Sequence, residues 1–150
     1  MRFKLFVFGV LMLCAYIGVP AQTGKKASPP VAVDQSSKAT AAYAEIALRR
    51  ADVEAELESL LVEYTDEFPK VRELKYSLTR VDAEVARLAA IKSAERDRAT
   101  SALGKLMVRK VEAELELWKL SQDYADNHPE VRRAKKKVEI YERAIKEILG

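Results

Sequence analysis

Residues Tyr64–Val71 read Y-T-D-E-F-P-K-V, and residues Tyr124–Val131 read Y-A-D-N-H-P-E-V. The two prolines, Pro69 and Pro129, lie 60 positions apart. A fixed period with a proline at the same phase indicates a duplicated supersecondary unit. Proline disfavours the α conformation in the residue before it and fits the first position of a new helix. Each copy is therefore predicted to be a helix, a tight turn and a second helix. The expected turn residues are Tyr64, Phe68, Pro69, Val71, Tyr124, His128, Pro129 and Val131.

The composition favours long helices. Charged residues make up 33% of the 150 positions, and the chain has only 5 glycines and 5 prolines. Enrichment in Ala, Glu, Lys, Leu and Arg is typical of long helices and coiled coils. We therefore expect an all-α fold of two tandem antiparallel helical hairpins, with coiled-coil-like contacts between the helices.

The first 21 residues resemble a secretory signal peptide. Arg2 and Lys4 precede the apolar run Leu5–Val19, and small residues follow it. The run is short for a membrane span, although an uncleaved anchor in the inner membrane is the alternative. Residues 22–39 are polar, with no apolar periodicity, and are predicted to be a disordered linker. The chain is thus expected to be exported, periplasmic or secreted, with a helical domain at 40–150.

Apolar residues recur at alternating spacings of three and four in both copies, which is the stripe of a heptad. The first helix should run from about Thr40 to Asp66, and the next should start at Pro69. Arg50 interrupts the first stripe at the place where Lys110 interrupts the third. Helices joined by so short a turn must be antiparallel. The repeats are expected at about 40–98 and 99–150.

The join between the repeats leaves two alternatives open. Residues 93–103 contain no proline or glycine, so one continuous central helix, from Pro69 to about Asn127 and roughly 90 Å long, is one of them. A compact four-helix bundle with a turn near Ala99–Gly104 is the other. The phase slip between the two stripes is one that a continuous helix absorbs by local unwinding, which favours the long helix.

A second apolar stripe lies on the third helix, away from its heptad seam. Its members are Val108, Val111, Leu115 and Trp118. An apolar face that includes Trp should be covered, either by the first hairpin or by another copy of the chain. We expect self-association or a helical protein partner, and treat these residues as a possible interaction face.

The sequence contains no arrangement that points to catalysis, so we expect a protein that is not an enzyme and has no cofactor and no metal. His128, the single histidine, is interpreted as a turn residue that caps the following helix. The glutamates within Glu54–Glu58 and Glu112–Glu116 are expected on solvated surfaces. The basic residues within Arg132–Lys137 are likewise expected to be a solvated face, and no nucleic-acid partner is expected. Membrane contact is expected only if the N-terminal segment stays uncleaved.

The pattern L-x-x-Y-x-D-x-x-P-x-V over Leu61–Val71, with a looser copy ending at Val131, resembles the periplasmic coiled-coil hairpins of polysaccharide chain-length determinants, the polysaccharide co-polymerase family. In that family a Tyr, a few residues, His-Pro and Val mark a turn between two long helices. The resemblance implies a hairpin and an envelope location. The first copy has Phe68 where the family has histidine. No kinase phosphate loop is found, so the family's catalytic and chain-length roles are not carried over.

Two functional hypotheses follow. The first is a non-enzymatic helical scaffold or protein-interaction module of a bacterial envelope, associated with polysaccharide export. The alternative is a periplasmic chaperone-like or metal- or ligand-binding module that uses the second stripe.

Overall fold

The computed structural model describes residues 40–150. The predicted signal peptide and linker lie outside the described residues. Within 40–150 the structure contains helices and no strand, which confirms the predicted all-α fold.

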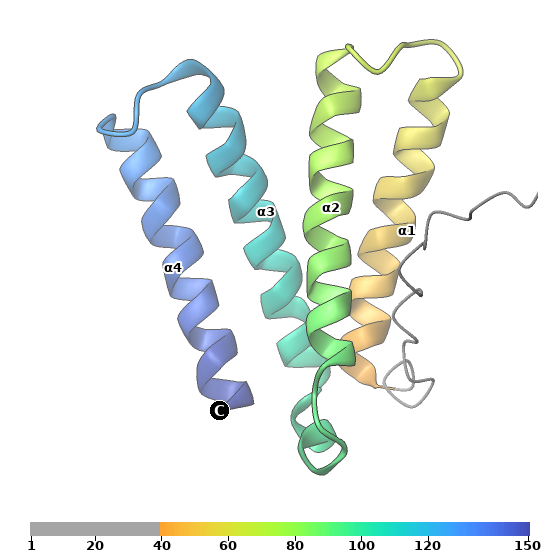
Figure 1. Ribbon diagram of the computed structural model, residues 1–150, viewed down its shortest axis with the longest axis vertical. Helices are drawn as coiled ribbons and strands as arrows, with labels where there is room; N and C mark the ends of the chain where they lie inside the picture. Colours follow the sequence, from red (N-terminus) through yellow and green to blue (C-terminus); the bar gives the residue numbers. More distant parts are fainter. Residues whose placement is uncertain (1–39) are drawn as a thin grey trace, which may run out of the picture. The chain divides into compact units, whose positions relative to one another are not determined.

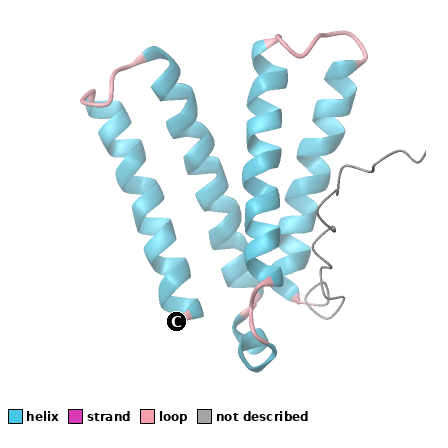
Figure 2. Cartoon of the chain, viewed as in Figure 1, coloured by secondary structure: helices cyan, strands magenta, loops and turns pink. Residues whose placement is uncertain are grey.

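Four α-helices form two antiparallel hairpins (Figures 1 and 2). Hairpin 1 consists of α1 (Ala41–Leu61) and α2 (Pro69–Ala89), and hairpin 2 consists of α3 (Ser101–Asp123) and α4 (Pro129–Leu149). Both members of the second pair begin 60 positions after their counterparts in the first. The sequence repeat is therefore also a structural repeat.

The start of each helix has a local cause that recurs in both repeats. The hydroxyls of Thr40 and Thr100 accept hydrogen bonds from the backbone N–H groups of Tyr43 (3.2 Å) and Leu103 (3.3 Å), which satisfies one free donor at each helix start. Prolines open α2 and α4, where a missing N–H costs nothing. Helix α1 ends earlier than predicted, at Leu61 rather than near Asp66.

The prediction of one long central helix is wrong. Helix α2 ends at Ala89, a 3₁₀ helix η2 covers Ser93–Arg98, and α3 starts at Ser101. The turn also comes earlier than the alternative at Ala99–Gly104. The break lets hairpin 1 fold back beside hairpin 2, and the connection is held in place by tertiary contacts. The backbone N–H of Ala42 donates to the carbonyl of Ala99 (3.1 Å), and Arg98 donates to the carbonyl of Leu149 (2.6 Å).

The two hairpins share a core at the end of the fold that carries the connection. Its buried members come from all four helices and the connection, and are Ala42, Ile46, Val81, Leu88, Ala99, Leu103, Met107, Val111 and Ile145. A second cluster joins α1 to α2 near their turn, and comprises Val53, Leu57, Val71 and Leu74. Helix α3 packs against α1, α2 and α4, whereas α4 packs mainly on α3.

One glycine permits the closest approach between the hairpins. Gly104 is buried in α3, and a Cβ atom there would lie 2.7 Å from the carbonyl oxygen of Ala42 and 2.8 Å from its Cα. Contacts this short are incompatible with a side chain, so glycine sets the distance between α1 and α3. Gly104, which the sequence placed at the end of a possible turn, therefore lies inside α3 and allows α1 to pack closely against it.

Candidate functional site

The tips of the two hairpins carry the same stacked aromatic pair. The rings of Tyr64 and Phe68 lie 4.2 Å apart between centroids, and those of Tyr124 and His128 also lie 4.2 Å apart. The places of the two tyrosines at the end of the heptad stripes predict core residues with the hydroxyl at the rim, but the tyrosines are 42% and 46% exposed. The reason is that α1 and α3 end before these positions, which turns the tyrosines onto the partner ring in the loop.

The remaining turn residues are buried, capped or paired at each tip. Val71 and Val131, two positions after the prolines, are fully buried. His128 caps α4 as expected, because its Nδ1 accepts a hydrogen bond from the backbone N–H of Glu130 (3.3 Å). An ion pair closes each turn at equivalent positions, Lys75 to Asp66 (2.7 Å) and Lys135 to Asp126 (3.0 Å).

The second repeated feature is a trio of charges inside each hairpin. In hairpin 1, Arg50 lies 2.8 Å from both Glu54 and Asp82. The residues 60 positions later are Lys110, Glu114 and Glu142, and Lys110 lies 3.6 Å from Glu114 and 3.0 Å from Glu142. The cations that interrupt the heptad stripes are therefore the centres of matching ionic clusters.

Burial separates the two trios. The side chain of Arg50 is 39% exposed, whereas that of Lys110 is 9% exposed because α2 lies over it. Helix α2 adds Glu84, 2.5 Å from Lys110, and Arg87, 3.0 Å from Glu142.

Arg80, also from α2, completes the cluster with a two-pronged hydrogen bond to Glu114, at 2.7 and 2.8 Å. Three cations thus meet three carboxylates, and the six side chains come from α2, α3 and α4. We call these six residues, Arg80, Glu84, Arg87, Lys110, Glu114 and Glu142, the buried ionic cluster.

Ion pairing favours the charged forms of three members of this cluster, Arg80, Lys110 and Glu142. Burial alone would raise the pKa of Glu142, but hydrogen bonds from Arg87 and Lys110 lower it to about 2. Burial opposes the charge of Lys110, yet its contacts with Glu84 and Glu142 raise its pKa above the ordinary value. Hydrogen bonding to Glu114 likewise raises the pKa of Arg80. Glu142, Lys110 and Arg80 therefore stay charged at neutral pH. They act as a specific polar contact between the hairpins.

Sequence reasoning missed this cluster. Glu114 was expected on a solvated surface, but it is 8% exposed because α2 covers it. A signal was present, since Arg50 and Lys110 interrupt their stripes at equivalent positions and Asp82 and Glu142 are acids at equivalent positions. The role of Glu84 had no counterpart in the repeat, because position 144 is alanine.

The stripe proposed as an interaction face is covered within the chain. Val111 is buried in the shared core, and Val108 packs against that core. Trp118 stacks on Tyr76 of α2, with 5.0 Å between ring centroids, and Leu115 is half-buried. Of the two ways to cover this face, the first hairpin therefore supplies the cover at Val108, Val111 and Trp118.

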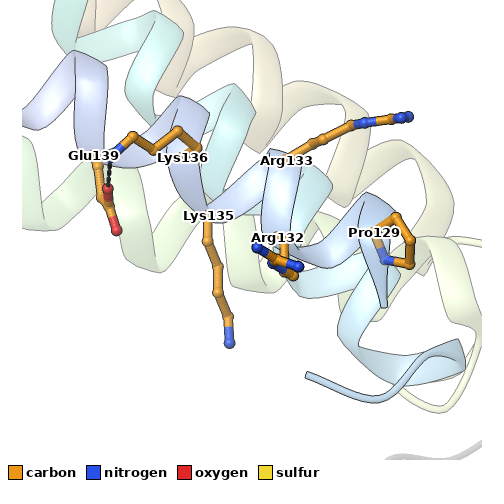
Figure 3. A pocket seen from close by; sticks show the side chains of 6 residues that line it. All are labelled: Pro129, Arg132, Arg133, Lys135, Lys136 and Glu139. Atoms are coloured by element: carbon orange, nitrogen blue, oxygen red, sulfur yellow. Dashed lines mark hydrogen bonds and ion pairs between the residues drawn. The ribbon is translucent and has the colours of Figure 1, made fainter. Parts of the chain in front are cut away.

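The basic stretch on α4 is solvent-exposed, as expected. Figure 3 shows a shallow surface pocket lined by the first turns of α4, with Arg132, Arg133 and Lys135 projecting from the helix and Lys136 reaching Glu139. The Lys136–Glu139 distance is 2.9 Å, and Lys137 lies 2.7 Å from Glu116 of α3. Exposed pairs of this kind contribute little to stability.

No group of three or more metal-binding side chains is found among residues 40–150, and no helix in that range is long and apolar enough to cross a bilayer. Comparison with protein-family models, with curated proteins and with solved structures finds no match to this chain.

Proposed function

We propose that the chain is a non-enzymatic, exported helical scaffold or protein-interaction module of a bacterial envelope. The observation that supports this most is the pair of matching tips. Each presents a tyrosine that is nearly half exposed and is stacked on a second ring, above a fully buried valine. Tyrosine held in this way offers a large contact area at a low entropic cost, which is why it is enriched in protein interfaces.

The location rests on two sequence features. The first 21 residues have the pattern of a secretory signal. The turn pattern resembles that of the polysaccharide co-polymerase hairpins, which supports an envelope location and an association with polysaccharide export. In the chaperone-like or ligand-binding alternative, the second stripe of α3 would hold the client. Hairpin 1 covers that stripe, so the scaffold has the stronger support.

The test is recovery of partner proteins by cross-linking in envelope extracts. We expect the native chain to recover at least one other protein, and the double variant Tyr64→Ala/Tyr124→Ala to lose it. Lys92→Ala is the matched control, because Lys92 is exposed in the connection between the hairpins, away from both tips. Recovery of no other protein by the native chain would contradict the proposal. Equal recovery by the tip variant would remove the tips as the contact.

A further inference from the structure

The contact between the two hairpins uses one face of α3. Gly104, Met107 and Val111 are buried on this face, and Val108 and Trp118 pack at its edges against hairpin 1. The opposing surface on hairpin 1 consists of Ala42 of α1 and of Ser77, Val81 and Glu84 of α2, all of which are buried. The interface between the repeats therefore has a donor face, on α3, and an acceptor face, on hairpin 1.

Because the chain is a duplication, α1 carries the equivalent of the donor face. The residues 60 positions before Gly104, Met107, Val108, Val111 and Trp118 are Ala44, Ala47, Leu48, Ala51 and Glu58. Four of these five residues are exposed and Ala47 is half-buried, with Leu48 63% exposed. Apart from Glu58 at its far end, this face is apolar, unlike the rest of the outer surface of α1. Nothing among residues 40–150 covers it.

Hairpin 2 carries the equivalent of the acceptor face. Ala102 takes the place of Ala42, and Lys137, Tyr141 and Ala144 of α4 take the places of Ser77, Val81 and Glu84. Ala102 is exposed where Ala42 is fully buried. Ile140, which takes the place of Arg80, is 49% exposed. Two charges of the buried ionic cluster, Arg80 and Glu84, are thus replaced by Ile and Ala on the free surface.

Charge also matches between the two helices that carry the free faces. Helix α1 has five acidic and two basic residues, whereas α4 has four acidic and seven basic residues. The stacked pair Tyr76–Trp118 has Lys136 and Glu58 at its equivalent positions, which are opposite charges. Lys136 is held only by an exposed pair with Glu139, which it can exchange at little cost.

From this we infer that a second copy of the chain docks its α1 face on the α3–α4 surface of the first, continuing across molecules the contact that joins the hairpins within one. The inference rests on the proposed scaffold function and names its partner. Repeat arrays are stable when each repeat is covered by a neighbour, and terminal repeats normally have polar outer faces. The outer face of α1, where Leu48 is exposed among alanines, is not a polar face of this kind. Ala44 carries the Cβ that Gly104 lacks, so the intermolecular helices lie farther apart than α1 and α3.

Such a contact is head-to-tail, because it joins two different surfaces. It predicts open assemblies whose size grows with concentration, or a closed ring. Two variants of the full chain test it by sedimentation velocity: Leu48→Glu damages the α1 face, and Ile140→Glu damages the α4 face. Both side chains are exposed, so the helicity of each variant should equal that of the native chain.

We expect the native chain to form species larger than a dimer, and each variant alone to stay monomeric. A mixture of the two variants should form a dimer and nothing larger, since each retains the face that the other has lost. A face-to-face dimer through α1 would instead leave Ile140→Glu dimeric and the mixture without a new species, which overturns the inference. A native chain that stays monomeric, as it would if residues 1–39 occupied the face, also overturns it. Neither result affects recovery of other proteins by the tips, which tests the proposed function separately.

Discussion

Lys110 is the residue whose loss should expose the energetics of this fold most clearly. Its side chain is 9% exposed and lies within ion-pair distance of Glu84, Glu114 and Glu142. Replacing it with methionine keeps most of the aliphatic length and removes the charge. The remaining two arginines then face three carboxylates, of which Glu84 and Glu114 are buried and Glu142 is 27% exposed. An uncompensated buried charge is costly, and removing one partner of a buried pair typically destabilises by about 3–5 kcal/mol.

The chain supplies its own control. Arg50 is the equivalent residue in hairpin 1 and makes equivalent contacts with Glu54 and Asp82, but its side chain is 39% exposed. Exposed ion pairs contribute about 0–1 kcal/mol. We therefore expect Lys110→Met to lower the free energy of unfolding by about 2–4 kcal/mol more than Arg50→Met does. The difference reports burial together with the partners that α2 adds, because the other two carboxylates are at equivalent positions in both sites.

The assay is equilibrium unfolding in urea, followed by far-ultraviolet circular dichroism and by tryptophan fluorescence. Trp118 is the only tryptophan in the sequence, and it stacks on Tyr76 of the other hairpin, so its emission reports contact between the hairpins. Adding Glu84→Gln to Lys110→Met should restore part of the loss, since it removes the excess carboxylate. Equal losses for Lys110→Met and Arg50→Met, or no restoration in the double variant, would refute this account of the buried ionic cluster.

Three further predictions concern helix contact, acid stability and the tips. Gly104→Ala should destabilise by about 1–3 kcal/mol by forcing α1 and α3 apart, whereas Ala44→Gly at the exposed equivalent position should cost about 0.5–1 kcal/mol; thermal unfolding compares them. The pKa of Glu142 is lowered from 4.5 to about 2, so the stabilisation by its carboxylate is present above about pH 5 and is lost as the pH falls towards about 2. In the variant Glu142→Gln, the free energy of unfolding should therefore depend less on pH over this range. Phe68→Ala should cost about 1–3 kcal/mol, because this ring packs on the core of hairpin 1, while His128→Ala should cost less than about 1 kcal/mol; equal losses would contradict a packing role for Phe68.

The hairpins themselves could be predicted from local rules. Pro69 and Pro129 restrict the preceding residue and open a new helix, so they mark the turns without reference to the rest of the chain. The heptad stripes then choose the buried face, and Val71 and Val131 are fully buried as that pattern requires. Thr100 is a further local signal, for the start of α3, that the prediction did not use. It lies 60 positions after Thr40 and caps α3 as Thr40 caps α1, which argues against a continuous central helix.

The candidate sites were less accessible to sequence. Tyr64 and Tyr124 were found, but their exposure depends on where α1 and α3 end, and such boundaries are the least certain part of a pattern-based prediction. The stripe with Trp118 was also found, but the side chains that cover it come from hairpin 1, at least 30 positions away along the chain. Periodicity shows that a face needs cover and does not identify what covers it.

By itself, the sequence determined two helical hairpins, because turn chemistry and apolar periodicity act over a few residues. Only the tertiary structure decided how the hairpins meet. That contact depends on the break after Ala89, on the space left by Gly104 and on three carboxylates gathered around Lys110. These features arise between residues distant along the chain, where burial turns an ordinary surface charge into a strong constraint, and no local pattern specifies which charges will be buried.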